Sequence, residues 1–217
     1  MDIESFKHSF DEIFLSELDR LLSRTKKRVH NTHIHGLLSH TYELAKNGKR
    51  IRPYVMALSY GAHTFDDAQE ISDQLVGIEL LHLFALVHDD IMDEALTRHG
   101  VASMNSFSEN CYEDLPNKNL QGKYEAILLG DLIFSFAYEL FSKGKGIHAL
   151  PLFFKLVDEV ITGQMLDIRI PFEEKVTKDM IRERMLFKTA RYSFARPMQI
   201  GAMLSEINSK DEALYFS

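Results

Sequence analysis

Cysteine is almost missing from this sequence: Cys111 is the only one among 217 residues. A single cysteine cannot form an intramolecular disulfide, and this usage is typical of a reducing compartment. The chain also lacks an apolar run long enough to span a bilayer, because Glu79 and His82 interrupt the best candidate. Its first ten residues lack the basic-then-apolar pattern of a signal peptide. These absences predict a soluble, cytoplasmic protein.

An excess of positive charge is lacking too. The 25 Lys and Arg residues are outnumbered by 32 Asp and Glu residues, which gives a formal net charge of -7. This balance argues against nucleic acid as a partner. Hydrophobic residues at 45% and charged residues at 26% are typical of a globular domain rather than of a disordered chain. The length fits a single domain with one good-sized core.

Sustained strand alternation is absent as well, and helical spacing replaces it. Apolar residues recur every three or four positions in several long segments, which predicts amphipathic helices. Helices are expected at about 3–22, 124–142 and 147–169, and a long helix that Asp66 or Asp67 can cap is expected to carry residues 75–93. Thr177 can cap a last long helix, which Pro197 should kink. A long polar loop is expected over 100–123. The predicted fold class is all-α, a bundle of long helices with short connections.

Three carboxylates end the most apolar of these helices. Asp89 and Asp93 share a helical face at spacing i, i+4, and Asp90 lies beside them. Like charges at this spacing repel, and the helix dipole disfavours anions near a C-terminus. A hard divalent cation such as Mg²⁺ would remove both penalties, and protein-bound Mg²⁺ usually also binds substrate phosphates. We favour a metal site over a solvated acidic helix end.

Other polar residues fit a phosphate-binding site. Lys49 and Arg52 stand three residues apart at a predicted helix N-terminus, where backbone N–H groups and two cations favour an anion. A solvated basic turn is the alternative. His82 lies two helical turns before Asp89, and Gln164 and Asp167 share a helical face. Four histidines in the N-terminal region could indicate zinc, but without cysteines a solvated turn is favoured: His30, His33, His35 and His40.

Together these motifs resemble the trans-isoprenyl diphosphate synthase (polyprenyl synthetase) family, of the short-chain farnesyl or geranylgeranyl type. The resemblance rests on seven features in the family's order: GKRIRP at 48–53, His82, HDDIMD at 88–93, Arg98 with Gly100, GD at 130–131, GQMLD at 163–167 and KTA at 188–190. They cover about 150 residues, and the ordered set is far more specific than any one motif. The resemblance implies an all-α bundle of mostly antiparallel helices around a central cavity, usually in a homodimer.

The resemblance also implies a role for each matching residue. Lys49, Arg52, His82 and His99 match positions that bind isopentenyl diphosphate. Arg98, Gln164, Lys188 and Thr189 match positions that bind the allylic diphosphate, and Asp167 is expected to orient Lys188. Asp89, Asp90 and Asp93 match the metal-binding motif, with Mg²⁺ as the expected ion and Mn²⁺ as the alternative. Catalysis would fall to Lys188, Arg98, Asp89 and Asp93. The implied reaction is head-to-tail prenyl transfer by ionisation of the allylic diphosphate.

Product length in this family depends on residues just before the first aspartate. Phe84 and Ala85 stand one turn before Asp89. A bulky Phe84 should close the floor of the tunnel while Ala85 leaves some room, which predicts a short product of about three or four isoprene units, C15–C20.

The sequence departs from the family pattern in three ways. His99 replaces the second arginine of the usual Arg-Arg-Gly and is a weaker, pH-dependent substitute. An insertion is expected near 106–118. No second aspartate-rich motif follows the KTA segment, so residues 1–217 are expected to form one domain that represents about two thirds of the family fold. A non-catalytic prenyl-diphosphate-binding subunit and a class I terpene cyclase remain the alternatives, although a cyclase needs no isopentenyl diphosphate site.

Overall fold

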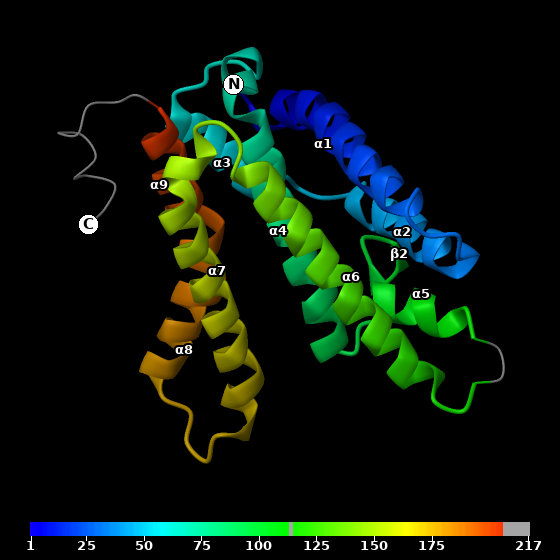
Figure 1. Ribbon diagram of the computed structural model, residues 1–217. Helices are drawn as coiled ribbons and strands as arrows, with labels where there is room; N and C mark the ends of the chain where they lie inside the picture. The colour runs from blue at the N-terminus through cyan, green and yellow to red at the C-terminus, as the bar shows by residue number, and fades with distance from the viewer. Residues whose placement is uncertain (113–114, 206–217) are drawn as a thin grey trace. The chain divides into compact units, whose positions relative to one another are not determined.

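Helices account for nearly all the regular structure in the computed structural model, which describes residues 1–112 and 115–205 (Figure 1). The predicted all-α class is confirmed. In chain order the elements are α1 (Ile3–Lys26), α2 (Thr32–Ala45), α3 (Ile51–Tyr60), η1 (Asp66–Ile71), α4 (Ser72–Met92), β1 (Thr97–Arg98), β2 (Val101–Ala102), α5 (Met104–Asn110), α6 (Lys118–Phe141), α7 (Gly146–Arg169), η2 (Ile170–Phe172), α8 (Lys178–Met185), η3 (Leu186–Ala195) and α9 (Arg196–Leu204).

The described residues group into two compact units along the chain. Unit 1 comprises 1–6, 50–78 and the chain from 141 onward, and unit 2 comprises 7–49 and 79–140. The boundaries between the units fall inside α1, α4 and α6 and between Lys49 and Arg50. Each candidate site residue therefore belongs to one of the two units.

Helix α4 begins at Ser72 rather than directly after the predicted cap, because Asp66 and Asp67 belong to the preceding 3-10 helix η1. At two other helix starts a side chain provides the cap. The Asn31 side chain accepts a hydrogen bond from the Ile34 N–H at the start of α2, and the Thr177 side chain does the same for Met180 at the start of α8. Between α2 and α3, Arg50 adopts a left-handed conformation with φ of 56°, so the chain turns sharply just before Ile51. Lys49 and Arg52 thus flank the start of α3, as predicted.

The predicted loop over 100–123 was wrong in most of its length. Residues 97–102 form a two-stranded antiparallel hairpin, α5 follows at once, and α6 already begins at Lys118. Strands of two residues are too short to show alternation, and α5 has only seven residues, so neither leaves a periodic signal. The insertion expected near 106–118 includes residues 113 and 114, which lie outside the described residues.

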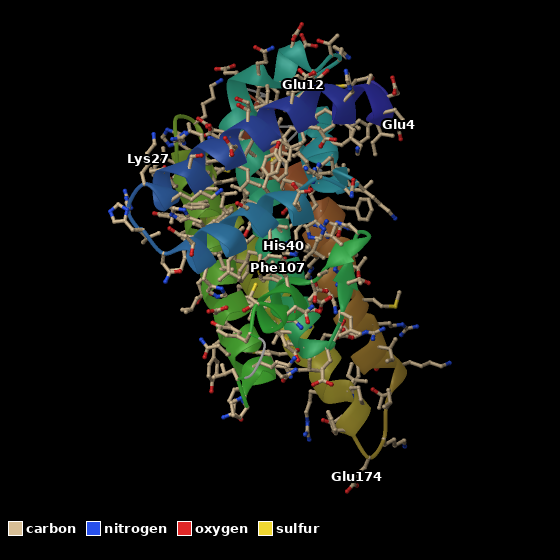
Figure 2. The ribbon with its side chains drawn as sticks, turned by 90° about the vertical axis from the view of Figure 1, so that its right-hand side faces the viewer. Glu4, Glu12, Lys27, His40, Phe107 and Glu174 are labelled. Atoms are coloured by element: carbon tan, nitrogen blue, oxygen red, sulfur yellow. The ribbon has the colours of Figure 1, made fainter. Side chains whose placement is uncertain are left out.

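His40 anchors this hairpin and α5 to α2. Its Nε2–H donates to the Ala102 carbonyl at 2.7 Å, and its ring stacks on Phe107 with centroids 3.9 Å apart. Figure 2 shows the two labelled side chains lying against each other. Burial lowers the pKa of His40 and so favours the neutral form of the ring. The hairpin that carries Arg98 is therefore fixed to unit 2 by a buried contact.

The segment after Thr177 was predicted as one helix with a kink at Pro197. It consists instead of three successive helical pieces, and the middle one, η3, has the wider π winding over ten residues. Pro197 lies in the first turn of α9, directly after this wide segment. The change of winding thus comes just before the proline, and η3 carries the KTA motif.

Candidate active site

The acidic end of α4 places its three carboxylates in different surroundings. Asp90 is buried with 1% of its surface exposed, whereas the Asp89 side chain is 21% exposed and Asp93 lies at the surface. Asp93 follows the last helical residue, yet its N–H donates to the Asp89 carbonyl at 2.8 Å, so the helical turn continues. The predicted i, i+4 relation of Asp89 and Asp93 is retained.

Arg98 pairs with the buried member of this group. Its Nε donates to Asp90 Oδ1 at 2.9 Å, its Nη2 donates to the same oxygen, and Nη2 lies 3.9 Å from Asp89 Oδ2. Burial raises the pKa of Asp90, and the hydrogen bonds from Arg98 only partly oppose this shift. The hairpin thus brings one predicted diphosphate ligand, Arg98, to two predicted metal ligands.

His99, the second candidate site residue of the hairpin, is exposed and lies in its turn in a left-handed conformation. His99 and Gly100 have φ values of 51° and 85°, and the His99 carbonyl accepts a hydrogen bond from Asn47 Nδ2 at 3.3 Å. This contact joins the hairpin to the loop before α3, where Lys49 is exposed two residues after Asn47. The predicted isopentenyl diphosphate residues Lys49 and His99 therefore lie on adjoining loops of unit 2. His82 is half-buried in α4 of the same unit.

His88 packs the acidic end of α4 onto α6. Its Nε2 lies 3.2 Å from the Ile127 carbonyl and 3.7 Å from Asp131 Oδ1. A Cβ at Gly130 would lie 2.3 Å from the same nitrogen, so only glycine allows this approach. Gly130 of the GD motif thus allows close contact between α4 and α6, and the neighbouring Asp131 has a side chain that is 62% exposed.

Phe84, the predicted tunnel floor, also lies between α4 and α6. Its ring is 4.6 Å from the His88 ring and 5.2 Å from the Phe134 ring, centroid to centroid. Phe84 and Ala85 are both half-buried. The predicted floor residue and the predicted metal-binding turn are therefore linked through His88.

Unit 1 holds the KTA lysine through an acidic residue of α7. Lys188 Nζ donates to Asp167 Oδ2, and Arg184 Nη1 donates to Asp167 Oδ1 at 2.8 Å. Burial alone would raise the pKa of Asp167, but the hydrogen bonds from Lys188 and Arg184 outweigh it, and the net pKa is lowered. The expected orientation of Lys188 by Asp167 agrees with this geometry. Arg184 was not predicted and could not be, because its nearness to Asp167 depends on how α8 packs on α7.

A close approach of η3 to α7 explains the glycine of the GQMLD motif. A Cβ at Gly163 would lie 2.5 Å from the Lys188 nitrogen and 2.8 Å from its Cα. These are backbone atoms, so they cannot yield as a side chain could. Gln164, the residue after Gly163, is half-buried, and Thr189, the residue after Lys188, is exposed. Unit 1 therefore brings the GQMLD and KTA motifs together.

Arg52 lies in unit 1 as well, on α3. Its guanidinium carbon is 4.2 Å from the centroid of the Tyr192 ring, and its Nη2 donates to Ser193 Oγ at 2.8 Å. Sequence reasoning missed Tyr192 and Ser193, although both follow the KTA motif within a few residues. The only feature of the sequence that could have indicated them is their position in the same predicted helix as the KTA motif.

The donor set on α4 fits a hard cation. Carboxylate oxygens are the ligands that Mg²⁺ prefers, and it is usually held by one or two carboxylates together with water and phosphates. Within residues 1–112 and 115–205, no three acidic, histidine or cysteine side chains converge closely enough to hold a metal by themselves. Asp89 and Asp93 therefore fit a site that needs phosphate oxygens to complete it, while Asp90 is engaged by Arg98.

Two solved structures share the fold of this chain. The fold is shared with the geranylgeranyl pyrophosphate synthase of Corynebacterium glutamicum, whose crystal structure was determined with isoprenyl diphosphate and magnesium. The TM-score is 0.82 at 24% sequence identity, over 98% of this chain and 63% of that chain. A polyprenyl synthase from Caulobacter crescentus shares the fold with a TM-score of 0.70 at 20% identity, over 99% of this chain and 60% of that chain.

The family follows from the sequence itself. A model of the polyprenyl synthetase family matches residues 35–216, so the chain belongs to that family, as predicted. It is 30% identical to the geranylgeranyl diphosphate synthase of Methanosarcina mazei, over 75% of this chain and 47% of that protein. It is also 30% identical to the short chain isoprenyl diphosphate synthase of Methanocaldococcus jannaschii, over 94% of this chain and 58% of that protein. The chain thus spans about half the length of these curated relatives.

Among the described residues, no helix is both long and apolar enough to cross a bilayer.

Proposed function

We propose that this protein is a prenyltransferase that condenses isopentenyl diphosphate with an allylic diphosphate to give a short trans-prenyl diphosphate. The observation that supports this most strongly is the acidic end of α4, where Arg98 lies against Asp90 and within 3.9 Å of Asp89. A cation and several carboxylates at one helix end suit a ligand that carries both phosphate oxygens and a divalent metal. Two relatives named as short-chain or geranylgeranyl synthases agree with this assignment.

In the proposed reaction, the C–O bond of the allylic diphosphate breaks and its electron pair leaves with the diphosphate. Arg98 and Lys188 would bind the leaving diphosphate and stabilise the charge that develops on it. The double bond of isopentenyl diphosphate then attacks the allylic carbon, and a proton is lost to the released diphosphate. Lys49, Arg52, His82 and His99 would bind isopentenyl diphosphate, while Gln164 and Thr189 would orient the allylic diphosphate.

Asp89 and Asp93 would hold the metal, with Asp90 as a supporting residue through Arg98. Bound Mg²⁺, or Mn²⁺ in its place, would neutralise diphosphate charge as a Lewis acid. The protein itself would hold the two carboxylates on one helical turn and would supply positively charged side chains for the diphosphate.

The test is incubation of the 217-residue chain with Mg²⁺, isopentenyl diphosphate and each of dimethylallyl, geranyl and farnesyl diphosphate, with products identified by mass. We expect a linear prenyl diphosphate and its loss in Asp89→Ala. Mg²⁺-dependent binding of the allylic diphosphate without turnover would instead identify a non-catalytic binding subunit. A hydrocarbon product would identify a class I terpene cyclase.

We infer a product of C15–C20 because Phe84 packs against Phe134 and His88 and would close the end of a tunnel along α4. Phe84→Ala should lengthen the product by at least one isoprene unit, while an unchanged product would reject this role. A Phe84→Tyr variant, which keeps the ring, is the control and should retain the wild-type product length.

The proposal also includes a homodimer and a cytoplasmic location. Light scattering of the purified chain tests the first, since a monomer at micromolar concentration would contradict it. Cell fractionation tests the second.

A further inference from the structure

Arg52 is restrained on two sides by consecutive residues of η3. The Tyr192 ring lies 4.2 Å below its guanidinium carbon, and Ser193 Oγ accepts from its Nη2 at 2.8 Å. Both residues are buried, with exposed fractions of 3% and 8%. All three lie in unit 1.

The two contacts restrain different motions of the same group. A guanidinium lying over an aromatic face is attracted by the ring quadrupole, which fixes the plane of the cation. The hydrogen bond to Ser193 then fixes its rotation within that plane. A planar fork held in this way is prepared for phosphate oxygens, because little rotamer freedom is lost on binding.

Arg52 also has an N–H group that can still donate a hydrogen bond. Its Nε is buried and has no hydrogen-bond partner among the described residues. A buried N–H without an acceptor is costly, and a binding site that supplies an acceptor recovers that cost.

We propose that Tyr192 and Ser193 are positioning residues that orient Arg52 for the diphosphate of isopentenyl diphosphate. The inference rests on the proposed function, in which Arg52 binds that substrate. It adds that η3 serves both substrates, since Lys188 and Thr189 of the same segment would bind the allylic diphosphate. The sequence KTARYS would then be one functional unit rather than a motif followed by packing residues.

The test compares the affinities for the two substrates in the full chain. Isothermal titration measures binding of isopentenyl diphosphate and, separately, of geranyl diphosphate with Mg²⁺. Tyr192→Leu should weaken binding of isopentenyl diphosphate about 3- to 30-fold. Ser193→Ala should weaken it about 2- to 10-fold. Neither should change the affinity for geranyl diphosphate by more than about twofold.

Conservative variants and a matched control separate positioning from packing. Tyr192→Phe keeps the ring and Ser193→Thr keeps the hydroxyl, so both should retain wild-type affinity. Tyr54→Leu removes another packed tyrosine of unit 1, whose ring lies 5.4 Å from Phe6, and should also leave isopentenyl diphosphate binding unchanged.

The sharpest readout is a double-mutant cycle with Arg52→Ala. If Tyr192 and Ser193 act through Arg52, neither substitution should weaken binding further once Arg52 is gone. Three outcomes would overturn the inference while leaving the proposed function intact. They are fully additive losses of affinity in the cycle, an equal loss of affinity for both substrates, and wild-type affinity in Tyr192→Leu and Ser193→Ala. Wild-type protein that binds no isopentenyl diphosphate would overturn the proposed function and this inference together.

Discussion

Asp90 differs from Asp89 and Asp93 in its burial and in its partner. The sequence placed all three acids on one helix end but could not show which of them is buried. That depends on the hairpin of residues 97–102, which returns Arg98 to α4 and has too few residues to be recognised in advance. The metal prediction for Asp89 and Asp93 stays a prediction, and Asp90 acquires a structural partner that the motif alone did not reveal.

The first prediction separates these two kinds of acid. Asp90→Ala leaves the half-buried Arg98 without its main partner and should lower the free energy of unfolding by about 1–3 kcal/mol. Asp93→Ala, at the surface, should change it by less than about 0.5 kcal/mol. Urea denaturation in the presence of EDTA measures both. Equal effects of the two substitutions would contradict the assignment.

The second prediction concerns the contact of His88 with Gly130. A methyl group at position 130 would displace the His88 ring from the Ile127 carbonyl and disturb its packing on Phe84. Gly130→Ala should therefore lower the free energy of unfolding more in the wild-type protein than in a His88→Ala background. In that background the added methyl group only improves helix propensity.

We expect a coupling of about 0.5–3 kcal/mol between these two substitutions in urea denaturation. Additive effects would mean that the His88 ring moves aside freely and does not hold α4 to α6.

At the scale of elements, periodicity predicted the long helices well because a buried stripe leaves a strong signal. Phe6, Phe10, Phe14 and Leu18 of α1 are all fully buried, as their spacing indicates. Periodicity could not predict the π winding of η3, because the apolar pattern of 186–195 suits an ordinary helix equally well. The close fit of Gly163 against Lys188 is likewise a property of two helices together.

The third prediction tests this fit with a pair of glycines. Gly163→Ala should lower the free energy of unfolding by about 1–3 kcal/mol, because the added Cβ meets backbone atoms of η3. A Cβ added at Gly36 in α2 would meet no atom within 4 Å, so Gly36→Ala should instead raise stability by about 0.5–1 kcal/mol. Thermal or urea denaturation measures whether each substitution raises or lowers the free energy of unfolding. Stabilisation by Gly163→Ala would show that α7 and η3 pack less closely than described.

For the whole molecule, the fold class and the order of the motifs were predictable, since both depend on patterns along the chain. The division into two interleaved units was not, because it depends on contacts between distant segments. The side-chain contacts of two glutamates also depend on how separate elements pack. Glu159 of α7 pairs with Arg196 and Arg191, and Glu125 of α6 accepts from Ser108, Tyr112 and His33.

The fourth prediction concerns acid. Burial would raise the pKa of Glu159, Glu125 and Asp167, but their hydrogen bonds outweigh it and lower all three. Stability from such carboxylates is present above their unfolded pKa and is lost as the pH falls through the folded one. Asp90 has the opposite sign, because its pKa is raised. Among the carboxyl groups that are at least half-buried, three lowered pKa values stand against one raised value. We therefore predict that the free energy of unfolding decreases as the pH drops below about 4.5.

Urea denaturation between pH 7 and pH 3 checks this expectation. Glu159→Gln should be less stable at pH 7 and should lose less stability on acidification than wild type. Parallel curves for the two proteins would show that Glu159 does not contribute to the acid response.

The exposed Cys111 at the end of α5 is the only thiol in the chain, and so it is a ready attachment point for a spectroscopic probe. No cysteine would have to be removed first. Partial burial and then the Glu125 carboxylate raise the pKa of this thiol, so labelling should accelerate as the solution is made more alkaline. A fluorophore placed there would report on α5 and the neighbouring hairpin, while the residues proposed to bind substrate kept their native side chains.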